Sequence, residues 1–183
     1  MTSLGQDRSA ALLGVILNGG RSSRMGCTKA SLELRGGERF LDHAIERFVS
    51  ICPHVVISVG EDLRTSINHK KIISVPDQKQ NIGLGPMSGI SACLQYAMTQ
   101  GFQGCFFTPI DVPNLKAIHL RLLKDRWGYD PSETVCAKNA RRKTIEPLIS
   151  IIPVSMHLSA NESIRKGELS VHRWLRDLNP IGV

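Results

Sequence analysis

Short apolar segments alternate with segments of helical periodicity along most of this chain, and this alternation restricts the possible folds more than any other feature of the sequence. Residues 12–17 form a continuous apolar run, typical of a strand buried on both faces of a sheet. Further strands are predicted at residues 55–59, 71–75, 105–110, 134–137 and 145–152. Helices are predicted at residues 40–51, 87–98, 114–126, 155–166 and 170–175.

This order of elements predicts an α/β fold with three layers, α/β/α, around a mostly parallel sheet. Such sheets bind ligands at the carboxyl ends of their strands. Two local details complete the prediction. An apolar stripe that ends in Phe48 and Val49 supports the first helix, and Asn114 is a residue type that can cap the third.

Length and composition fit one globular domain. With 183 residues, 42% of them apolar, we expect a single domain over residues 1–183 with a flexible segment at 1–10. No apolar run approaches the roughly 20 residues of a membrane helix, and no signal-peptide cleavage pattern follows the first apolar run. The five cysteines are odd in number, and the nearest two are 12 residues apart. These spacings favour a reducing, cytoplasmic location over a disulfide framework or a zinc site.

The net charge points to an acidic partner. Lys and Arg number 23 and Asp and Glu number 16, so the formal charge is 23 − 16 = +7. The basic residues are scattered, with the densest cluster at residues 141–143, and no basic helix or RNA-binding aromatic motif accompanies them. A phosphorylated small molecule therefore fits better than nucleic acid or a membrane surface.

The most informative segment is the glycine-rich loop at residues 17–29, directly after the first predicted strand. Glycines let a backbone approach a ligand closely, and their N–H groups can form an anion-binding concavity. Arg21, Arg24 and Lys29 add positive charge that would match a polyphosphate. The loop has neither the Walker A nor the dinucleotide-binding glycine spacing. An ordinary basic surface loop is the alternative interpretation.

The pattern LxGGxSxRMGxxK in this loop resembles nucleotidyltransferases related to molybdenum cofactor guanylyltransferase. The resemblance covers about residues 12–180 and implies a Rossmann-like nucleotidyltransferase fold. It implies that Arg24 and Lys29 neutralise the triphosphate of the nucleotide. The first residues of the loop would contact the nucleotide: Leu17, Asn18, Gly19 and Gly20.

Two later motifs extend the predicted nucleotide site. Asp77 follows the strand that ends in Val75, and the resemblance implies that it contacts the guanosine portion of the nucleotide. A carboxylate can accept two hydrogen bonds from the guanine edge or the ribose hydroxyls. Gly85 opens the sequence GPMSG, which resembles the start of the family helix that borders the nucleotide. Without the resemblance, Asp77 is a turn residue after a proline and Gly85 belongs to an ordinary helix start.

Asp111 is the candidate metal ligand. It falls at the carboxyl end of an apolar strand, within a DxP pattern completed by Pro113. Mg²⁺ is usually held by one or two carboxylates with substrate phosphates and water, so one well-placed Asp is sufficient. The resemblance gives Asp111 this role, as a catalytic and nucleotide-binding residue, whereas the plain alternative is a solvated aspartate before a turn.

The second half of the chain shows one shared feature and two departures. Residues 141–148, RRKTIEPL, resemble a family strand on the side where the second substrate binds. A basic hairpin without function and a site for the acceptor's phosphate are equally open interpretations. Gly60 stands where the family commonly has an Asn, and the tail after Asn179 is shorter than the family pattern.

The resemblance implies transfer of GMP from GTP to the terminal phosphate of molybdopterin, with Mg²⁺ and release of pyrophosphate. A phosphate nucleophile is ionised near neutral pH, so no general base is required. Transient contacts with proteins of molybdenum cofactor biosynthesis or with recipient enzymes would follow. One alternative is the same fold with CTP or another phosphorylated acceptor. The other is a non-catalytic, nucleotide-binding adaptor for a molybdoenzyme.

Overall fold

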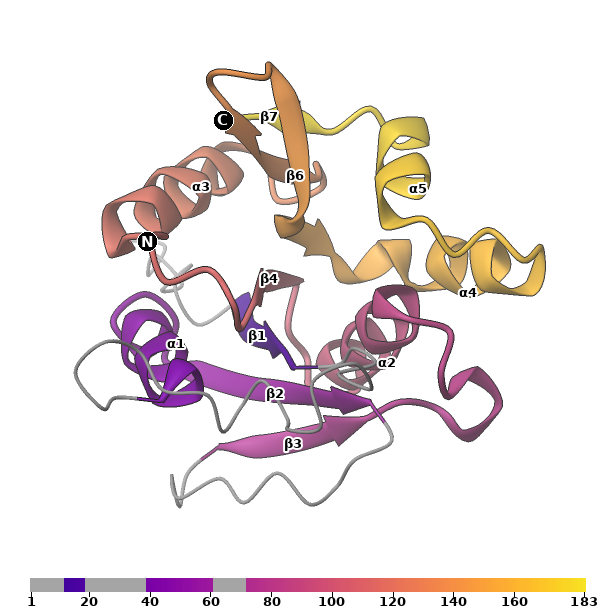
Figure 1. Cartoon of the computed structure of the whole chain (residues 1–183). Coiled ribbons are helices and arrows are strands. Elements are labelled where there is room, and N and C mark those ends of the chain that lie inside the picture. Colours follow the sequence, from indigo (N-terminus) through magenta and orange to yellow (C-terminus); the bar gives the residue numbers. More distant parts are fainter. Residues whose placement is uncertain (1–11, 19–38, 61–71) are drawn as a thin grey trace, which may run out of the picture.

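The strands of the described residues form one seven-stranded sheet. The computed structural model describes residues 12–18, 39–60 and 72–183. The strands are β1 (Leu12–Leu17), β2 (His54–Gly60), β3 (Ile73–Pro76), β4 (Gly104–Pro109), β5 (Val135–Asn139), β6 (Thr144–Pro153) and β7 (Ile181–Gly182). Their order in the sheet is β3-β2-β1-β4-β6-β5-β7 (Figure 1). The first four are mutually parallel, and β6 runs antiparallel to both of its neighbours.

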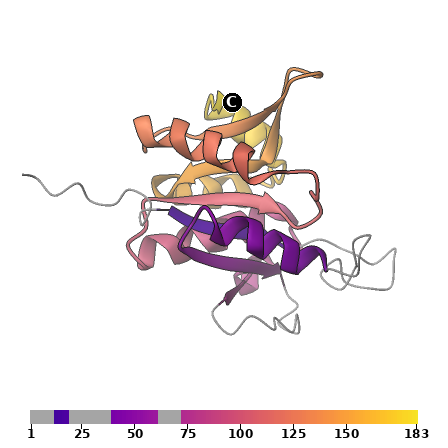
Figure 2. The same cartoon turned by 90° about the vertical axis from the view of Figure 1, so that its left-hand side faces the viewer.

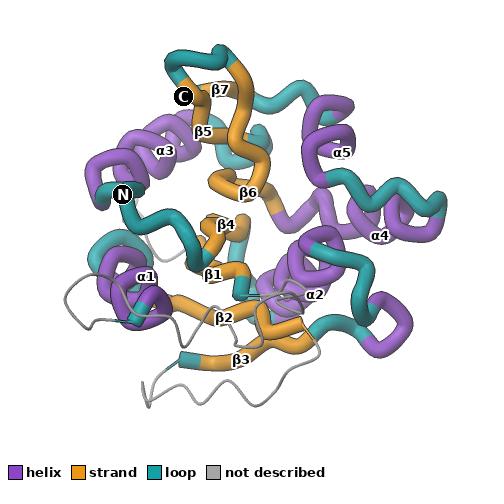
Figure 3. The backbone as a smooth tube through the Cα atoms, in the orientation of Figure 1, coloured by secondary structure: helices purple, strands orange, loops and turns teal. Residues whose placement is uncertain are grey.

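Helices cover both faces of this sheet. They are α1 (Phe40–Val49), α2 (Pro86–Thr99), α3 (Ala117–Tyr129), α4 (His157–Arg165) and α5 (Val171–Asp177), with short 3-10 turns η4 (Lys79–Asn81) and η5 (Val154–Met156). Helices α1 and α3 lie on one side and α2, α4 and α5 on the other (Figures 1 and 3). The predicted three-layer α/β/α architecture is therefore confirmed. No helix within the described ranges is long and apolar enough to span a membrane.

The first strand shows why the sequence folds this way. All six residues of β1 are buried. Leu13, Val15 and Leu17 pack in the core on the α2 side, whereas Leu12 and Ile16 pack in the core on the α1 side. A strand with apolar neighbours on both faces needs an unbroken apolar run, as the sequence predicts.

Three local details differ from the predictions. Asn114 lies in the turn after β4, and Lys116 is the N-cap residue of α3, so the predicted Asn114 cap is wrong. The Leu115 N–H donates to the Val112 carbonyl and closes this turn. As a result, α3 begins only at Ala117. Val49 at the end of α1 is 52% exposed and lies outside the buried stripe. The short strand β7 was not predicted.

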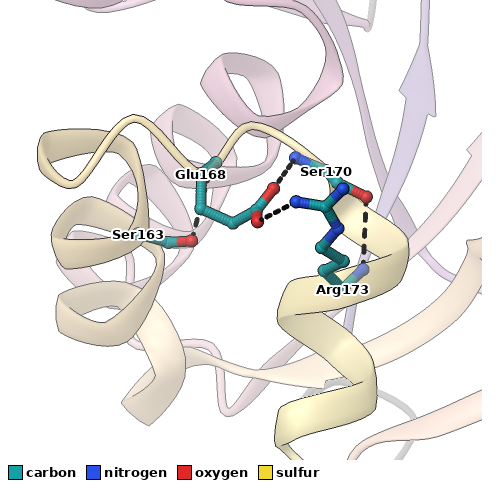
Figure 4. A network of polar contacts seen from close by, with 4 residues as sticks. All are labelled: Ser163, Glu168, Ser170 and Arg173. Atoms are coloured by element: carbon teal, nitrogen blue, oxygen red, sulfur yellow. Dashed lines mark hydrogen bonds and ion pairs between the residues drawn. The ribbon is translucent and has the colours of Figure 1, made fainter.

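A polar network fixes the turn between α4 and α5 (Figure 4). The Ser170 hydroxyl accepts a hydrogen bond from the Arg173 N–H at 3.3 Å and caps α5. The Glu168 carboxylate accepts from the Ser170 N–H and from the Arg173 guanidinium, both at 2.9 Å. The Ser170 N–H and the Arg173 side chain hold the pKa of Glu168 below its ordinary value, so the ionised form is the one that orders this turn.

Several predictions fall on residues 1–11, 19–38 or 61–71, outside the described residues. They are the flexible start at 1–10 and most of the glycine-rich loop, including Gly19, Gly20, Arg24 and Lys29. The single domain over residues 1–183 stays a prediction.

Candidate functional site

The carboxyl ends of β3, β2, β1 and β4 meet along one edge of the sheet, and the described site residues lie along it. In the sheet register, Leu17 pairs with Ser58 of β2 and with Pro109 of β4. Gly60 of β2 pairs with Pro76 of β3. Leu17, Asn18, Asp77 and Asp111 therefore lie at or just after the carboxyl ends of β1, β3 and β4, which the parallel order places on one side of the sheet.

Backbone hydrogen bonds tie these strand ends together. The Asn18 N–H donates to the Ser58 carbonyl at 2.9 Å, and the Ile110 N–H donates to the Leu17 carbonyl at 3.2 Å. The Asp77 N–H donates to the Gly60 carbonyl at 3.0 Å. The Asn18 N–H and the Leu17 carbonyl are therefore both used in holding these strand ends together.

Gly60 ends β2 in a left-handed conformation with φ of 61°. Glycine adopts this conformation freely, and asparagine adopts it more readily than most other residues. The position where the family commonly carries Asn thus keeps a backbone conformation that Asn tolerates. What the substitution removes is a side-chain amide, while the Gly60 carbonyl still positions Asp77.

The Asp77 side chain is partly buried at this edge. Its Oδ1 atom is buried and has no hydrogen-bond partner among the described residues. Burial raises the pKa of Asp77 from 3.8 to about 6. An unpaired buried carboxylate oxygen costs free energy in the unliganded protein, and a ligand that donates N–H or O–H groups would recover it.

The start of α2 packs tightly beneath the same edge. Gly85 precedes the helix with φ of 78°, and its carbonyl accepts from the Ser88 N–H at 3.1 Å. A Cβ atom on Gly89 would collide with Ser58 Oγ and would lie 3.6 Å from Leu17 Cδ2. The glycine at position 89 therefore lets the first turn of α2, which follows Gly85, reach the ends of β1 and β2.

Asp111 is exposed, and it lies one residue beyond the Ile110 N–H that is bonded to β1. No group of three or more His, Cys, Asp or Glu side chains that could hold a metal ion occurs among the residues the structure describes. Among the described residues, Asp111 offers one carboxylate at this strand end. A carboxylate fits a hard cation such as Mg²⁺, which binds few carboxylates and takes its other ligands from phosphates and water.

The sequence did not identify Arg47 as a functional residue. It comes from α1, is 7% exposed, and donates to two carbonyls in the segment that follows Asp111. The sequence gives only a weak indication that Arg47 is buried. It stands next to Phe48 and three residues after Ala44, on the side of α1 whose other buried residues are apolar.

The hairpin between β5 and β6 carries the basic cluster of residues 141–143. Ser150 of β6 pairs with Phe107 of β4, and β4 ends at Pro109, so residues 144–147 continue past the carboxyl end of β4. The Asn139 carbonyl Oδ1 accepts from the Arg141 and Arg142 N–H groups at 3.1 Å, which shapes the exposed tip. Figure 2 shows the hairpin projecting from the body of the molecule.

Comparisons with known proteins agree with this geometry. The family model described as MobA-like NTP transferase domain matches residues 14–181. A protein of Rhodopirellula baltica named "Probable molybdenum cofactor guanylyltransferase" is 34% identical over 182 residues, which cover 96% of this chain and 84% of that protein.

Two solved structures have the same fold. Molybdopterin-guanine dinucleotide biosynthesis protein A from Archaeoglobus fulgidus aligns with a TM-score of 0.74 at 20% identity, over 93% of this chain and 82% of that one. The manganese complex of Rv0371C from Mycobacterium tuberculosis aligns with a TM-score of 0.58 at 15% identity, over 86% and 81% of the two chains.

Proposed function

Because the chain belongs to the MobA-like NTP transferase domain family, we propose that it transfers GMP from GTP to the terminal phosphate of molybdopterin and releases pyrophosphate. The similarity to a named guanylyltransferase over 96% of the chain supports the reaction. The observation that carries the nucleotide assignment is the buried Oδ1 of Asp77 at the carboxyl edge of the sheet, which has no hydrogen-bond partner among the described residues.

Asp77 selects guanine in this proposal. Guanine presents adjacent N–H donors on one edge, which a carboxylate can accept as a pair. Cytosine offers a single exocyclic amino group, so it would leave one oxygen of Asp77 unsatisfied. Discrimination by an unsatisfied buried polar group is strong. If Asp77 instead accepts from the ribose hydroxyls, it would not distinguish GTP from CTP.

Charge neutralisation and positioning supply the chemistry. Asp111 would hold Mg²⁺ together with phosphate oxygens and water, and the cation would offset the negative charge of the triphosphate. Arg24 and Lys29 would neutralise the remaining charge, most strongly as charge moves to the leaving group. An oxygen of the acceptor phosphate would form the new bond to the α-phosphorus of GTP. The bond between the α-phosphorus and the oxygen that bridges the α- and β-phosphates would break, and pyrophosphate would leave with that electron pair.

The basic hairpin is the proposed contact for the acceptor. Arg141, Arg142 and Lys143 are exposed at the tip of a hairpin that extends past the carboxyl end of β4. A phosphate-bearing pterin would meet complementary charge there. We place the reaction in the cytoplasm, because the cysteines of the described residues are free and buried. Transient contacts with other proteins of molybdenum cofactor biosynthesis or with recipient enzymes follow from this role.

The direct test is pyrophosphate release from GTP and molybdopterin in the presence of Mg²⁺, with CTP in a parallel reaction. We expect release with GTP and at least tenfold less with CTP. Asp111→Asn should raise the Mg²⁺ concentration needed for activity, and Lys29→Ala should lower turnover by about 10²-fold, as loss of one transition-state donor does. Nucleotide binding without any pyrophosphate release would favour the adaptor alternative, and faster release with CTP would favour a cytidylyltransferase.

A further inference from the structure

Arg47 is a buried cation without an ion pair among the described residues. Its exposed fraction is only 7%, and no salt bridge to it is present there. Its Nε and Nη2 atoms are buried and have no hydrogen-bond partner in the part of the chain that the structure describes. Burial lowers the pKa of Arg47 from its ordinary value. A residue chosen for packing alone would be apolar here, because burying an unpaired charge is costly.

The hydrogen bonds that the Arg47 guanidinium donates to described residues go to one segment. Its Nη1 atom donates to the Val112 carbonyl at 2.8 Å and to the Leu115 carbonyl at 3.0 Å. The Leu115 N–H also donates to the Val112 carbonyl at 3.1 Å, which closes a turn at the same place. One guanidinium nitrogen therefore joins both ends of this turn to α1.

This turn begins one residue after Asp111. Ile110, on the other side of Asp111, is fixed to β1 by its bond to the Leu17 carbonyl. Asp111 thus lies between two anchors, the sheet on one side and the Arg47 guanidinium on the other. An exposed residue held at both neighbours has fewer backbone conformations to lose when it binds a ligand.

We propose that Arg47 is a positioning residue that holds the segment 111–115 so that Asp111 is presented to the divalent cation of the nucleotide complex. The proposal rests on the function proposed above. Arg47 itself touches neither the cation nor the nucleotide in this role. It acts through the Val112 and Leu115 carbonyls. Its loss would weaken the binding of the divalent cation and would leave the affinity for the metal-free nucleotide unchanged.

The test compares Arg47→Met and Arg47→Lys with a matched control, Lys124→Met. Lys124 on α3 also donates to a backbone carbonyl, that of Ile51 at 2.7 Å, but that carbonyl has no connection with Asp111. Mn²⁺ binding in the presence of a non-hydrolysable GTP analogue can be followed by electron paramagnetic resonance. Hydrogen exchange of the amides of residues 111–115 is measured in the same proteins without ligand.

We expect Arg47→Met to weaken Mn²⁺ binding about tenfold and to speed exchange at residues 111–115 about tenfold, with metal-free binding of the analogue unchanged. Arg47→Lys should fall between the wild type and Arg47→Met, since an ammonium can donate to the same carbonyls but stands on a side chain one atom shorter. Lys124→Met should leave both properties as in the wild type.

Wild-type Mn²⁺ affinity and wild-type exchange in a folded Arg47→Met protein would overturn the proposal. If Arg47→Met does not fold, the Arg47→Lys protein decides, and unchanged Mn²⁺ affinity and exchange there would also overturn it. Failure of the guanylyl transfer proposal has a different signature, in which the wild type releases no pyrophosphate although exchange at residues 111–115 still depends on Arg47.

Discussion

Asp77 should destabilise the unliganded protein, and replacing it with the neutral isostere Asn should reveal by how much. Folding raises the pKa of this carboxyl from 3.8 to about 6. At about 1.4 kcal/mol for each tenfold change in acidity, ionised Asp77 costs the folded state up to about 3 kcal/mol. Its side chain is only partly buried, so solvent screening reduces this figure, and we expect Asp77→Asn to stabilise the protein by about 1–2 kcal/mol at pH 8.

The pH dependence of that gain identifies its cause. Between pH 4 and 6 the folded chain holds more proton on Asp77 than the unfolded chain does, so wild-type stability falls as the pH rises through this window. Above pH 6 the penalty is complete. The amide introduced by Asp77→Asn does not titrate, so the difference between the two proteins should grow from near zero at pH 4 to its full value above pH 6.

Urea unfolding of both proteins from pH 4.5 to 8 measures this difference. Asp130→Asn is the matched control, because hydrogen bonds from Ser132 lower the pKa of Asp130. Loss of the Asp130 charge should therefore destabilise the protein above the ordinary carboxyl pKa, with the opposite sign to Asp77→Asn. A loss of stability in Asp77→Asn at pH 8, or an equal gain at every pH, would refute the burial argument.

Two further predictions concern packing and capping. In Gly14→Ala the new Cβ would lie 2.8 Å from Phe48 Cδ1. Overpacking should therefore lower the free energy of unfolding, measured by urea denaturation, by about 1–3 kcal/mol. An unchanged urea midpoint would mean that Phe48 can move aside. Ser170→Ala removes the acceptor of the Arg173 N–H and should cost about 1 kcal/mol by thermal unfolding, whereas Ser170→Asp, which keeps an acceptor, should cost little.

The strands and helices could be predicted because burial on two faces leaves a direct signature in the sequence. The run at residues 12–17 is apolar throughout because alternate side chains meet different helix layers. The two-residue strand β7 has no such signature, since it is too short to show a periodic pattern. It is held by the Ile181 N–H, which donates to the Thr134 carbonyl at 2.9 Å. Asn114 is a favoured cap by residue type, but the turn at Val112 and Leu115 decides where α3 begins.

The same contrast holds at the site. Asp77 and Asp111 could be predicted to share an edge because each follows a predicted strand, and parallel strands end on the same side. The role of Arg47 could not be predicted in this way. Its partners are carbonyls 65 and 68 residues away along the chain, and every residue type carries a carbonyl. Only the folded geometry shows which of them a buried arginine reaches.

The raised pKa of Asp77 also predicts a proton released when GTP binds. Donors on the guanine edge stabilise the ionised carboxylate, so binding should return the pKa of Asp77 toward its ordinary range. At pH 6 the free protein carries about half a proton on this group, and the complex should carry almost none. Titration calorimetry of GTP at pH 6 in two buffers of different ionisation enthalpy counts the protons that leave.

The triphosphate titrates in the same range, so the wild-type count alone does not isolate Asp77. Asp77→Asn provides the subtraction, because it keeps the phosphate contribution and lacks the carboxyl. We expect about half a proton more from the wild type at pH 6 and no difference at pH 8, where Asp77 is ionised before GTP arrives. Equal proton release by the two proteins at pH 6 would mean that GTP does not reach the Asp77 carboxylate, and guanine selection would then have to come from another part of the edge.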